Sequence, residues 1–295
     1  MSATESIALV CAADDAYAMP LAVTLRSASQ NLRPGYGLEV FVLDGGMRKN
    51  HRAMVEGSVD PARARLHWRV PSESSTRRLS RDGRLSIVTC FRLLAGDLLP
   101  PNAHRAIFLD CDVVVLGDLA HLWQTPTGKH PICAVRDTII GSVGSPLGLA
   151  NHRELGLPAD LPYLNAGVLL LDLDAWREQR LGERFLRYLE ERHPQNGYRD
   201  QEAMNAVLRG SWGTLDPRWN QLPGSDVEDP WVVHYATWEK PWNFRCPHPA
   251  RELFYCYLDE TRWSGWRPRK TLADTALGRL GLRAWRGLRR RALSR

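Results

Sequence analysis

The sequence has no long hydrophobic run, no closely spaced cysteine pair and no basic, apolar leader, and each absence excludes a class of protein. Within its 295 residues, no uninterrupted apolar run approaches the ~20 residues that a membrane-spanning helix needs. The six cysteines are scattered without a C-x-x-C pair, so they are expected to be reduced thiols rather than disulfide partners or zinc ligands. The first residues do not resemble a signal peptide. We therefore expect a cytoplasmic protein.

Several familiar catalytic motifs are also missing. The chain contains no G-x-G-x-x-G after a predicted strand, no Walker A loop, no G-x-S-x-G and no H-E-x-x-H. Dinucleotide redox chemistry, P-loop phosphoryl transfer, α/β-hydrolase chemistry and zincin proteolysis therefore have no support from the sequence.

An excess of positive charge is present only at the C-terminus. The composition, 44% hydrophobic and 24% charged, is that of an ordinary globular protein. The formal net charge is +6, yet residues 270–295 contain eight Lys and Arg against one Asp. The rest of the chain is nearly neutral, so the high isoelectric point is no argument for nucleic-acid binding by the body of the protein.

Short β-type runs alternate with amphipathic stretches along the first half of the chain. Strands are predicted at residues 7–13, 38–43, 64–70, 105–109 and 131–135, and helices at 20–30 and 49–57. A further helix is predicted to start with residues 85–94 and to end near Pro100. This alternation predicts an α/β fold with a mostly parallel sheet flanked by helices. Because such sheets bind ligands at the carboxyl ends of their strands, motifs at those ends are the candidates for function.

Two D-x-D sequences follow apolar runs. Asp110 and Asp112 end a predicted strand, and in an extended chain residues i and i+2 point to the same face, so this pair is a candidate site for Mg²⁺ or Mn²⁺. The alternative is a pair of solvated aspartates at a strand end. The second pair, Asp172 and Asp174, precedes a helical start, and there we expect a structural role with Asp174 as the N-cap.

His234 and Lys240 are candidates to act together with the first aspartate pair. A short apolar run precedes His234, and a neutral imidazole is a suitable third ligand for Mn²⁺. Lys240, next to Pro241, is suited to neutralise a departing diphosphate as a point charge. A single histidine is otherwise an ordinary core or surface residue.

Taken in order, these segments resemble glycosyltransferase family 8. The resemblance runs from about residue 7 to residue 243 and is closest to bacterial lipopolysaccharide galactosyltransferases and glucosyltransferases. It implies a GT-A type catalytic domain at residues 1–245 and a C-terminal extension at 246–295. The matching segments are AADDAY at 12–17, SIVTCFR at 86–92, DCD at 110–112, LNAGVLL at 164–170, DQEAMN at 200–205 and H234 followed by K240-P-W.

The resemblance implies a retaining enzyme that moves glucose or galactose from a UDP-sugar to a saccharide or glycolipid acceptor with Mn²⁺ or Mg²⁺. Carried over, Asp110, Asp112 and His234 would hold the metal. Gln201 stands where a double displacement would need a carboxylate nucleophile, so the expected reaction is a front-face attack. The implied catalytic residues are Gln201, Asp200 and Lys240. The implied donor-binding residues are Ala12, Asp14, Tyr17, Arg92, Asp110, Asn165, Ala166, Asp200, Gln201 and Lys240.

Structural alternatives stand beside several of these roles. Arg92 could pair with Asp97, Asp200 could cap the helix at 201–208, residues 165–167 could form a turn entering a strand, and Tyr17 could serve packing. The chain also departs from the family pattern at Ala16, where asparagine is common, and at Thr237, where glycine is usual. The alternative functions are a sugar nucleotidyltransferase and a non-catalytic relative that binds UDP and metal.

The C-terminal tail has an amphipathic helical pattern over residues 277–293, with arginines on one side and Trp285 near the apolar edge. Such a segment is typical of helices that lie on an anionic membrane surface. Three glycines weaken the helix, and docking on the body or disorder is the alternative. Nucleic acid is the least expected partner, because stacking aromatic residues are missing there. The tail thus predicts peripheral attachment to the inner face of the cell membrane.

Overall fold

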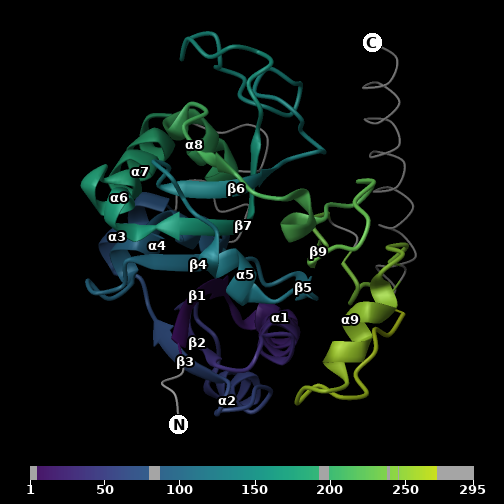
Figure 1. The fold of residues 1–295 in the computed structure, drawn as a ribbon. Helices are drawn as coiled ribbons and strands as arrows, with labels where there is room; N and C mark the ends of the chain where they lie inside the picture. Colours follow the sequence, from purple (N-terminus) through teal and green to yellow (C-terminus); the bar gives the residue numbers. More distant parts are fainter. Residues whose placement is uncertain (1–4, 80–86, 193–198, 238–239, 245, 271–295) are drawn as a thin grey trace.

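The computed structural model describes residues 5–79, 87–192, 199–237, 240–244 and 246–270, and its centre is a seven-stranded β-sheet (Figure 1). Every neighbouring pair of strands is parallel except the two pairs that include β7. The predicted mostly parallel α/β sheet is therefore confirmed. In spatial order the strands are β3 (Ala64–Arg69), β2 (Tyr36–Asp44), β1 (Glu5–Ala13), β4 (Arg105–Leu109), β7 (Leu164–Asp172), β6 (Ile132–Arg136) and β8 (Gly213–Thr214).

Helices cover both faces of the sheet because its strands are apolar on both sides. In β4, Ala106 and Phe108 belong to one buried cluster and Ile107 and Leu109 to the other, which is the period-two alternation of a strand. The first cluster includes α3 (Glu73–Leu79), the 3-10 helix η2 (Ile87–Leu94), α4 (Ala95–Leu98), α6 (Leu173–Glu178), α7 (Leu181–Glu191) and α8 (Arg199–Leu208). The second includes α1 (Ala18–Gln30), α2 (Lys49–Glu56) and α5 (Leu119–Gln124).

The predicted elements occur with small shifts at their ends. All five predicted strands and the helices at 20–30 and 49–57 are present, with ends that differ by at most two residues. The helix predicted to run from 85–94 to near Pro100 is instead the 3-10 helix η2 followed by the single α-turn α4; residues 85 and 86 lie outside the described residues. The predicted N-cap at Asp174 is wrong. Since β7 continues to Asp172, the carboxylate of Asp172 caps α6 and accepts from the backbone N–H of Ala175 at 2.9 Å.

A second, two-stranded sheet joins segments that are far apart in the sequence. It pairs β5 (Val113–Val115) antiparallel with β9 (Val232–His234), so that Val113 lies opposite His234. The backbone N–H of Tyr235 donates to the carbonyl of Asp112 at 3.0 Å. This pairing fixes His234 beside the first D-x-D.

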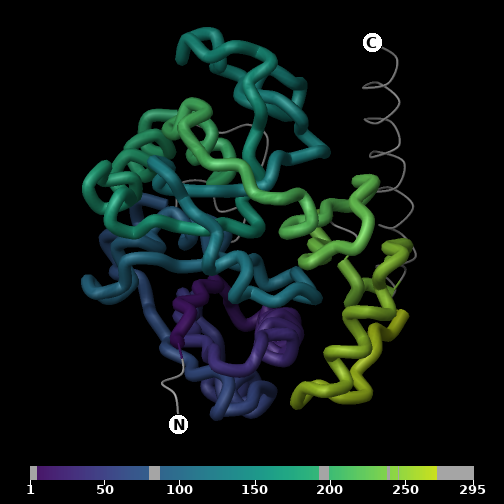
Figure 2. The backbone as a smooth tube through the Cα atoms, viewed as in Figure 1, coloured from purple at the N-terminus to yellow at the C-terminus, as the bar shows by residue number. Residues whose placement is uncertain are grey.

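The described part of the predicted C-terminal extension packs on the body. α9 (Arg251–Leu258) shares a buried cluster with Val23 of α1 and Tyr235, and Arg26 of α1 forms an ion pair with Glu260 at 2.8 Å. In Figures 1 and 2, α9 lies alongside α1 and β9. The division at residue 245 stays a prediction, and the predicted basic helix at 277–293 lies outside the described residues.

The carboxyl ends of β1, β4 and β6 meet at the edge of the sheet where β7 begins, because β7 alone runs in the opposite direction. The 3-10 turn η1 (Asp15–Tyr17) follows β1, residues 110–112 connect β4 to β5, and residues 137–163 form the long loop between β6 and β7 at the top of Figure 2. These connections build the candidate site.

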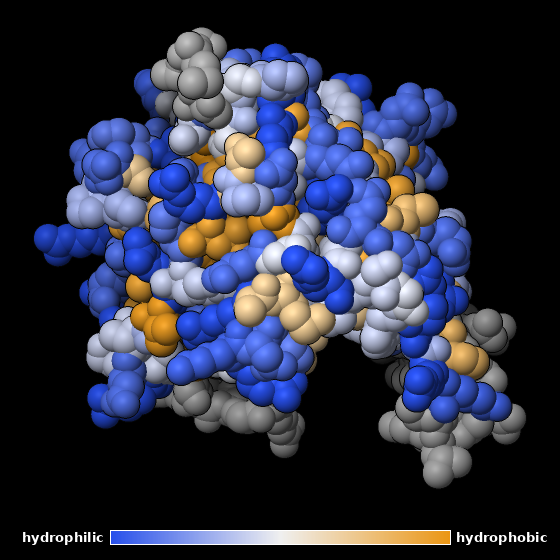
Figure 3. Space-filling model, turned by 90° about the horizontal axis from the view of Figure 1, so that it is seen from below, coloured by the Kyte–Doolittle hydropathy of each residue, from blue (hydrophilic) through white to orange (hydrophobic). Residues whose placement is uncertain are grey.

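The face seen from below in Figure 3 is mainly hydrophilic, with hydrophobic residues gathered largely in a hollow near its middle. The large hydrophobic side chains exposed in the described part are Val70, Ile139, Leu147 and Trp266. Throughout that part, each helix is too short or too polar to cross a membrane.

Candidate active site

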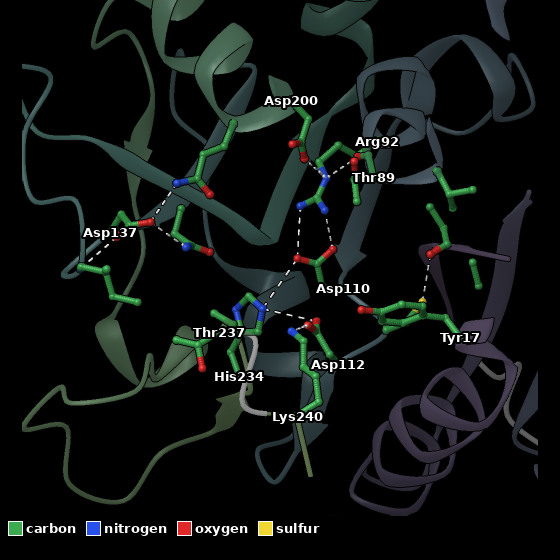
Figure 4. Close-up of a pocket in the computed structure, with 18 of the residues that line it drawn as sticks. Tyr17, Thr89, Arg92, Asp110, Asp112, Asp137, Asp200, His234, Thr237 and Lys240 are labelled. Carbon is green, nitrogen blue, oxygen red and sulfur yellow. Dashed lines mark hydrogen bonds and ion pairs between the residues drawn. The ribbon is translucent and has the colours of Figure 1, made fainter. Parts of the chain in front are cut away.

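A cavity of about 430 Å³ opens at this edge of the sheet (Figure 4). All the metal-binding, catalytic and donor-binding residues predicted from the sequence line this cavity, except Ala166. The predicted residues that do line the cavity are Ala12, Asp14, Tyr17, Arg92, Asp110, Asp112, Asn165, Asp200, Gln201, His234 and Lys240. The fold thus gathers residues from positions 12 to 240 around one space.

Asp110, Asp112 and His234 converge on one point of the cavity. Their ligand atoms all lie within 4.8 Å of one another; Nε2 of His234 is 3.7 Å from a carboxylate oxygen of Asp110 and 3.4 Å from one of Asp112. The aspartates lie in a turn between β4 and β5, not in an extended strand. The backbone N–H of Asp110 donates to the carbonyl of Gly167 at 2.8 Å, which ties this turn to β7. The three side chains converge as predicted, although the local geometry differs.

The chemistry of this group fits a divalent cation. Carboxylates are the preferred ligands of Mg²⁺ and Mn²⁺, and an imidazole favours Mn²⁺. The cavity wall also carries more negative than positive charge, which would repel a diphosphate unless a cation were bound. Two of its lining side chains, Arg92 and Lys240, are cationic, and five are carboxylates: Asp14, Asp110, Asp112, Asp137 and Asp200.

Arg92 is a buried cation in the wall of the cavity, held in place by two carboxylates. Arg92 is 7% exposed, and its guanidinium donates to both oxygens of Asp110 at 2.6 and 3.2 Å and pairs with Asp200 at 2.7 Å. Burial alone would lower the pKa of Arg92, but the two carboxylates raise it above its usual value. Arg92 also donates to the carbonyl of Ala166 at 2.6 Å, so Ala166 helps to hold this arginine from behind. These contacts, rather than a pair with Asp97, orient Arg92, and Asp200 lies within the first turn of α8.

Lys240 lies beside the metal-binding group. It forms an ion pair with Asp112 and donates to the carbonyl of Tyr235 at 2.6 Å. Burial raises the pKa of Asp112, but the opposing effects, of which the charge of Lys240 is the largest, hold it well below its usual range. For Asp110, burial raises the pKa and Arg92 offsets this only in part. The two aspartates therefore have unequal environments within one site.

Asp14 and Tyr17 form the side of the cavity next to β1. The carboxylate of Asp14 accepts from the backbone N–H groups of Ala16 at 3.1 Å and Tyr17 at 3.3 Å, which closes the turn into η1. The phenol of Tyr17 points into the cavity (Figure 4), and its ring packs edge-on against Trp242 with centroids 5.8 Å apart. Burial raises the pKa of Tyr17 above its usual value. Tyr17 thus both packs and lines the site.

Asp137, which the sequence analysis missed, organises the opposite side. Its carboxylate accepts from Nδ2 of Asn165 at 2.9 Å and from Nε2 of Gln201 at 2.8 Å. Oε1 of Gln201 accepts from the backbone N–H of Ala166 at 3.1 Å, so both ends of this amide are fixed. Residues 165–167 lie inside β7 rather than in a turn. The signal for Asp137 was its place just after the strand at 131–135, at the same sheet edge as Asp110.

Known proteins share this arrangement of elements. A family model described as Glycosyl transferase family 8 matches residues 8–246. The chain belongs to glycosyltransferase family 8. Membership makes it a glycosyltransferase and favours this activity over the sugar nucleotidyltransferase considered from the sequence. It also implies a divalent cation, a nucleotide-sugar donor and a saccharide acceptor.

Relatives of this family 8 enzyme include two bacterial proteins. General stress protein A of Bacillus subtilis (strain 168) is 26% identical over 289 residues, which cover 90% of this chain and 97% of that protein. The lipopolysaccharide 1,2-glucosyltransferase of Escherichia coli (strain K12) is 27% identical over 194 residues, which cover 61% of this chain and 56% of that enzyme.

Solved structures support the GT-A type fold. The crystal structure of galactosyltransferase LgtC in complex with donor and acceptor sugar analogs matches with a TM-score of 0.74 and 25% identity. The match covers 86% of this chain and 96% of LgtC. The predicted fold is thereby confirmed.

Proposed function

We propose that this family 8 enzyme transfers glucose or galactose from a UDP-sugar to a saccharide or glycolipid acceptor, with Mn²⁺ and with retention of anomeric configuration. The observation that carries the proposal is the convergence of Asp110, Asp112 and His234 in a cavity that all the predicted donor-binding residues except Ala166 also line. The names of two relatives, a glucosyltransferase and a galactosyltransferase, support a hexose as the transferred group.

Asp110, Asp112 and His234 would hold the cation next to the donor diphosphate. The bound cation would neutralise the charge that develops on the departing UDP. Mn²⁺ is proposed ahead of Mg²⁺ because one ligand is an imidazole. Lys240 would add a second positive charge on the diphosphate, and Ala12, Asp14 and Tyr17 would surround the uridine.

Gln201 and Asp200 would act at the transferred sugar. An amide is a poor nucleophile, so Gln201 is unsuited to a double displacement. In the proposed front-face reaction, the acceptor oxygen bonds to the anomeric carbon while the bond from that carbon to the UDP oxygen breaks, and the acceptor proton passes to the departing phosphate. Oε1 of Gln201 or the carboxylate of Asp200 would stabilise the positive charge on the sugar ring.

The catalytic domain is proposed to comprise residues 1–245 and the extension residues 246–295, in a cytoplasmic protein. The basic residues of the tail would attach this enzyme to the inner face of an anionic membrane. Flotation with anionic liposomes tests this attachment: the intact protein should float and a protein ending at residue 270 should not. Equal flotation of both would contradict it.

A donor-hydrolysis screen tests the activity. UDP-glucose, UDP-galactose, UDP-N-acetylglucosamine and GDP-mannose are each incubated with Mn²⁺, Mg²⁺ or EDTA, and nucleotide release is measured. We expect UDP release from one or both UDP-hexoses, fastest with Mn²⁺ and absent with EDTA. Release that is unchanged by EDTA would contradict the metal site, and release from GDP-mannose alone would contradict the proposed donor.

A further inference from the structure

Hydrogen bonds between buried side chains connect Asn165 to His234 through Asn220. Oδ1 of Asn165 accepts from Nδ2 of Asn220 at 2.8 Å, and Oδ1 of Asn220 lies 2.8 Å from Nδ1 of His234. The exposed fractions of Asn165, Asn220 and His234 are 5%, 2% and 4%. Asn220 is not among the residues that line the cavity, and it belongs to none of the motifs recognised in the sequence.

The orientation of the Asn165 side-chain amide is fixed by two neighbours, one of which can only donate a hydrogen bond and the other only accept one. The backbone N–H of Gly167 donates to its Oδ1 at 2.9 Å, and the carboxylate of Asp137 accepts from its Nδ2 at 2.9 Å. The same carboxylate accepts from the backbone N–H groups of Ile139 and Ile140 at 2.9 and 2.8 Å. A flipped Asn165 would place its amino group against an N–H and its carbonyl against a carboxylate.

The orientation of Asn220 follows from that of Asn165. Since Oδ1 of Asn165 can only accept, Asn220 must present its Nδ2 there and its Oδ1 to His234. Oδ1 of Asn220 is again only an acceptor, so Nδ1 of His234 must carry a proton. In a neutral imidazole the other nitrogen, Nε2, then has a free lone pair, and Nε2 is the nitrogen that faces Asp110 and Asp112.

We infer that Asn220 is a positioning residue of this transferase, one that holds His234 in the tautomer able to ligate a cation through Nε2. The role of Asn220 in cation binding rests on the proposed metal-dependent function. The first test, which measures the tautomer of His234, does not depend on that function. Hydrogen bonds of this kind to the second nitrogen orient a metal-binding histidine and set its tautomer, and their loss typically costs about 10–100-fold in metal affinity.

Local structure brings Asn220 to this position. It ends the 3-10 helix η3 (Pro217–Asn220), which the carboxylate of Asp216 caps by accepting from the backbone N–H of Arg218 at 2.9 Å. The following residue, Gln221, pairs with β9: its N–H donates to Val232 at 2.9 Å and its carbonyl accepts from the N–H of His234 at 3.0 Å. Asn220 and His234 are thus held in register by backbone bonds, independently of a cation.

The first test measures the tautomer directly in the metal-free protein. Long-range ¹H–¹⁵N correlation spectra of protein labelled at histidine distinguish protonated from unprotonated ring nitrogens, and the His234 signals are identified by their absence in His234→Gln. At alkaline pH, we expect His234 to be protonated at Nδ1 in the unaltered chain. Protonation at Nε2 there would overturn the inference, whatever the variants do.

Variants then assign the tautomer to Asn220. Asn220→Asp keeps an acceptor at Nδ1 and should keep the Nδ1-protonated form, whereas Asn220→Leu removes it and should shift the population toward the other tautomer. Asn205→Leu is the matched control: Asn205 is also 2% exposed and bonded to the backbone of Leu164 and Gln201, but its loss should leave His234 unchanged. An unchanged tautomer in Asn220→Leu would contradict the inference.

The second test measures the affinity for free Mn²⁺ by electron paramagnetic resonance. We expect Asn220→Leu to bind about 10–100-fold more weakly than the unaltered chain, with Asn220→Asp closer to the unaltered value. Equal affinities would contradict the positioning role. If the unaltered chain itself binds no divalent cation, the proposed function fails, while the tautomer measurement still decides whether Asn220 positions His234.

Discussion

The imidazole of His234 lies directly against the backbone of Gly167. An ideal Cβ built on Gly167 would come within 2.2 Å of Cε1 and 2.5 Å of Nδ1 of His234, which is far closer than atoms approach without displacement. Gly167 is an interior residue of β7, where glycine usually weakens a strand unless another group must approach closely. Here the approaching group is the proposed metal ligand.

Gly167→Ala should therefore weaken cation binding. The added methyl group must push the imidazole away from Asp110 and Asp112, and we expect the Mn²⁺ affinity to fall by about tenfold or more. Gly96→Ala is a matched control, because its Cβ would come 2.3 Å from the ring of Trp176, away from the cavity. Both variants should melt at lower temperature, but only Gly167→Ala should lose affinity. Equal affinities in both would show that His234 does not depend on this contact.

The two D-x-D sequences give a second prediction. Asp110→Asn removes a charged ligand and should lower kcat/KM by roughly 10²–10³-fold, since charge stabilisation at a departing group is worth several kcal/mol. Asp174→Asn changes the other D-x-D at an exposed site where the carboxylate contacts His104 at 2.8 Å. It should leave turnover and Mn²⁺ dependence unchanged. Comparable losses in both variants would mean that Asp110 has no special role.

Gln201→Ala tests the proposed front-face reaction. The variant loses the amide that lies between Asp137 and the backbone of Ala166, so kcat should fall by about 10²-fold, the usual effect of removing one stabilising group. The KM for the donor should change much less, because the effect is expected in the transition state. Gln124→Ala, an exposed glutamine bonded to Tyr36, is the control. Full turnover of Gln201→Ala would remove this residue from the mechanism.

The cysteines give a prediction that does not depend on the function. None of the six forms a disulfide; Cys256 is exposed and the others are buried. Burial raises the pKa of Cys90 to about 12, so at pH 8 only about 1 in 10⁴ of this thiol is the reactive thiolate. Iodoacetamide at pH 8 should modify Cys256 in the folded protein and leave Cys90 unmodified until urea is added, as read by peptide mass spectrometry. Early modification of Cys90 would contradict its buried position in η2.

Much of the fold could be predicted from the sequence because it depends on local patterns. Short apolar runs bounded by turn residues place strands such as residues 105–109 to within two positions, and helical spacing does the same for residues 18–30. The D-x-D at Asp110 stood out since it follows such a strand. The ordered set of short motifs then indicated the family. The match of the family model to residues 8–246 confirms it.

Predictions from local sequence patterns were wrong where strand pairing decides the structure at the end of an element. The expected cap at Asp174 is wrong because β7 runs on to Asp172, and strand length is set by pairing with β4 and β6 rather than by the residues themselves. In the same way, residues 110–112 form a turn and not an extended strand, since β5 must leave β4 to pair with β9. Such outcomes depend on partners that are distant in the sequence.

By itself, the sequence determined the α/β class and the positions of the strands, because these follow from residue type and short-range periodicity. Asp110, Asp112, His234 and Lys240 were indicated by the resemblance of the ordered motifs to family 8. Only the tertiary structure decided that β5 pairs with β9, that Asp137 holds Asn165 and Gln201, and that Asn220 faces His234. The first is a pairing of strands that are far apart in the sequence, and the others are single polar contacts between residues without any repeating pattern. Their partners are chosen by sheet register and burial, which act only once the chain has folded.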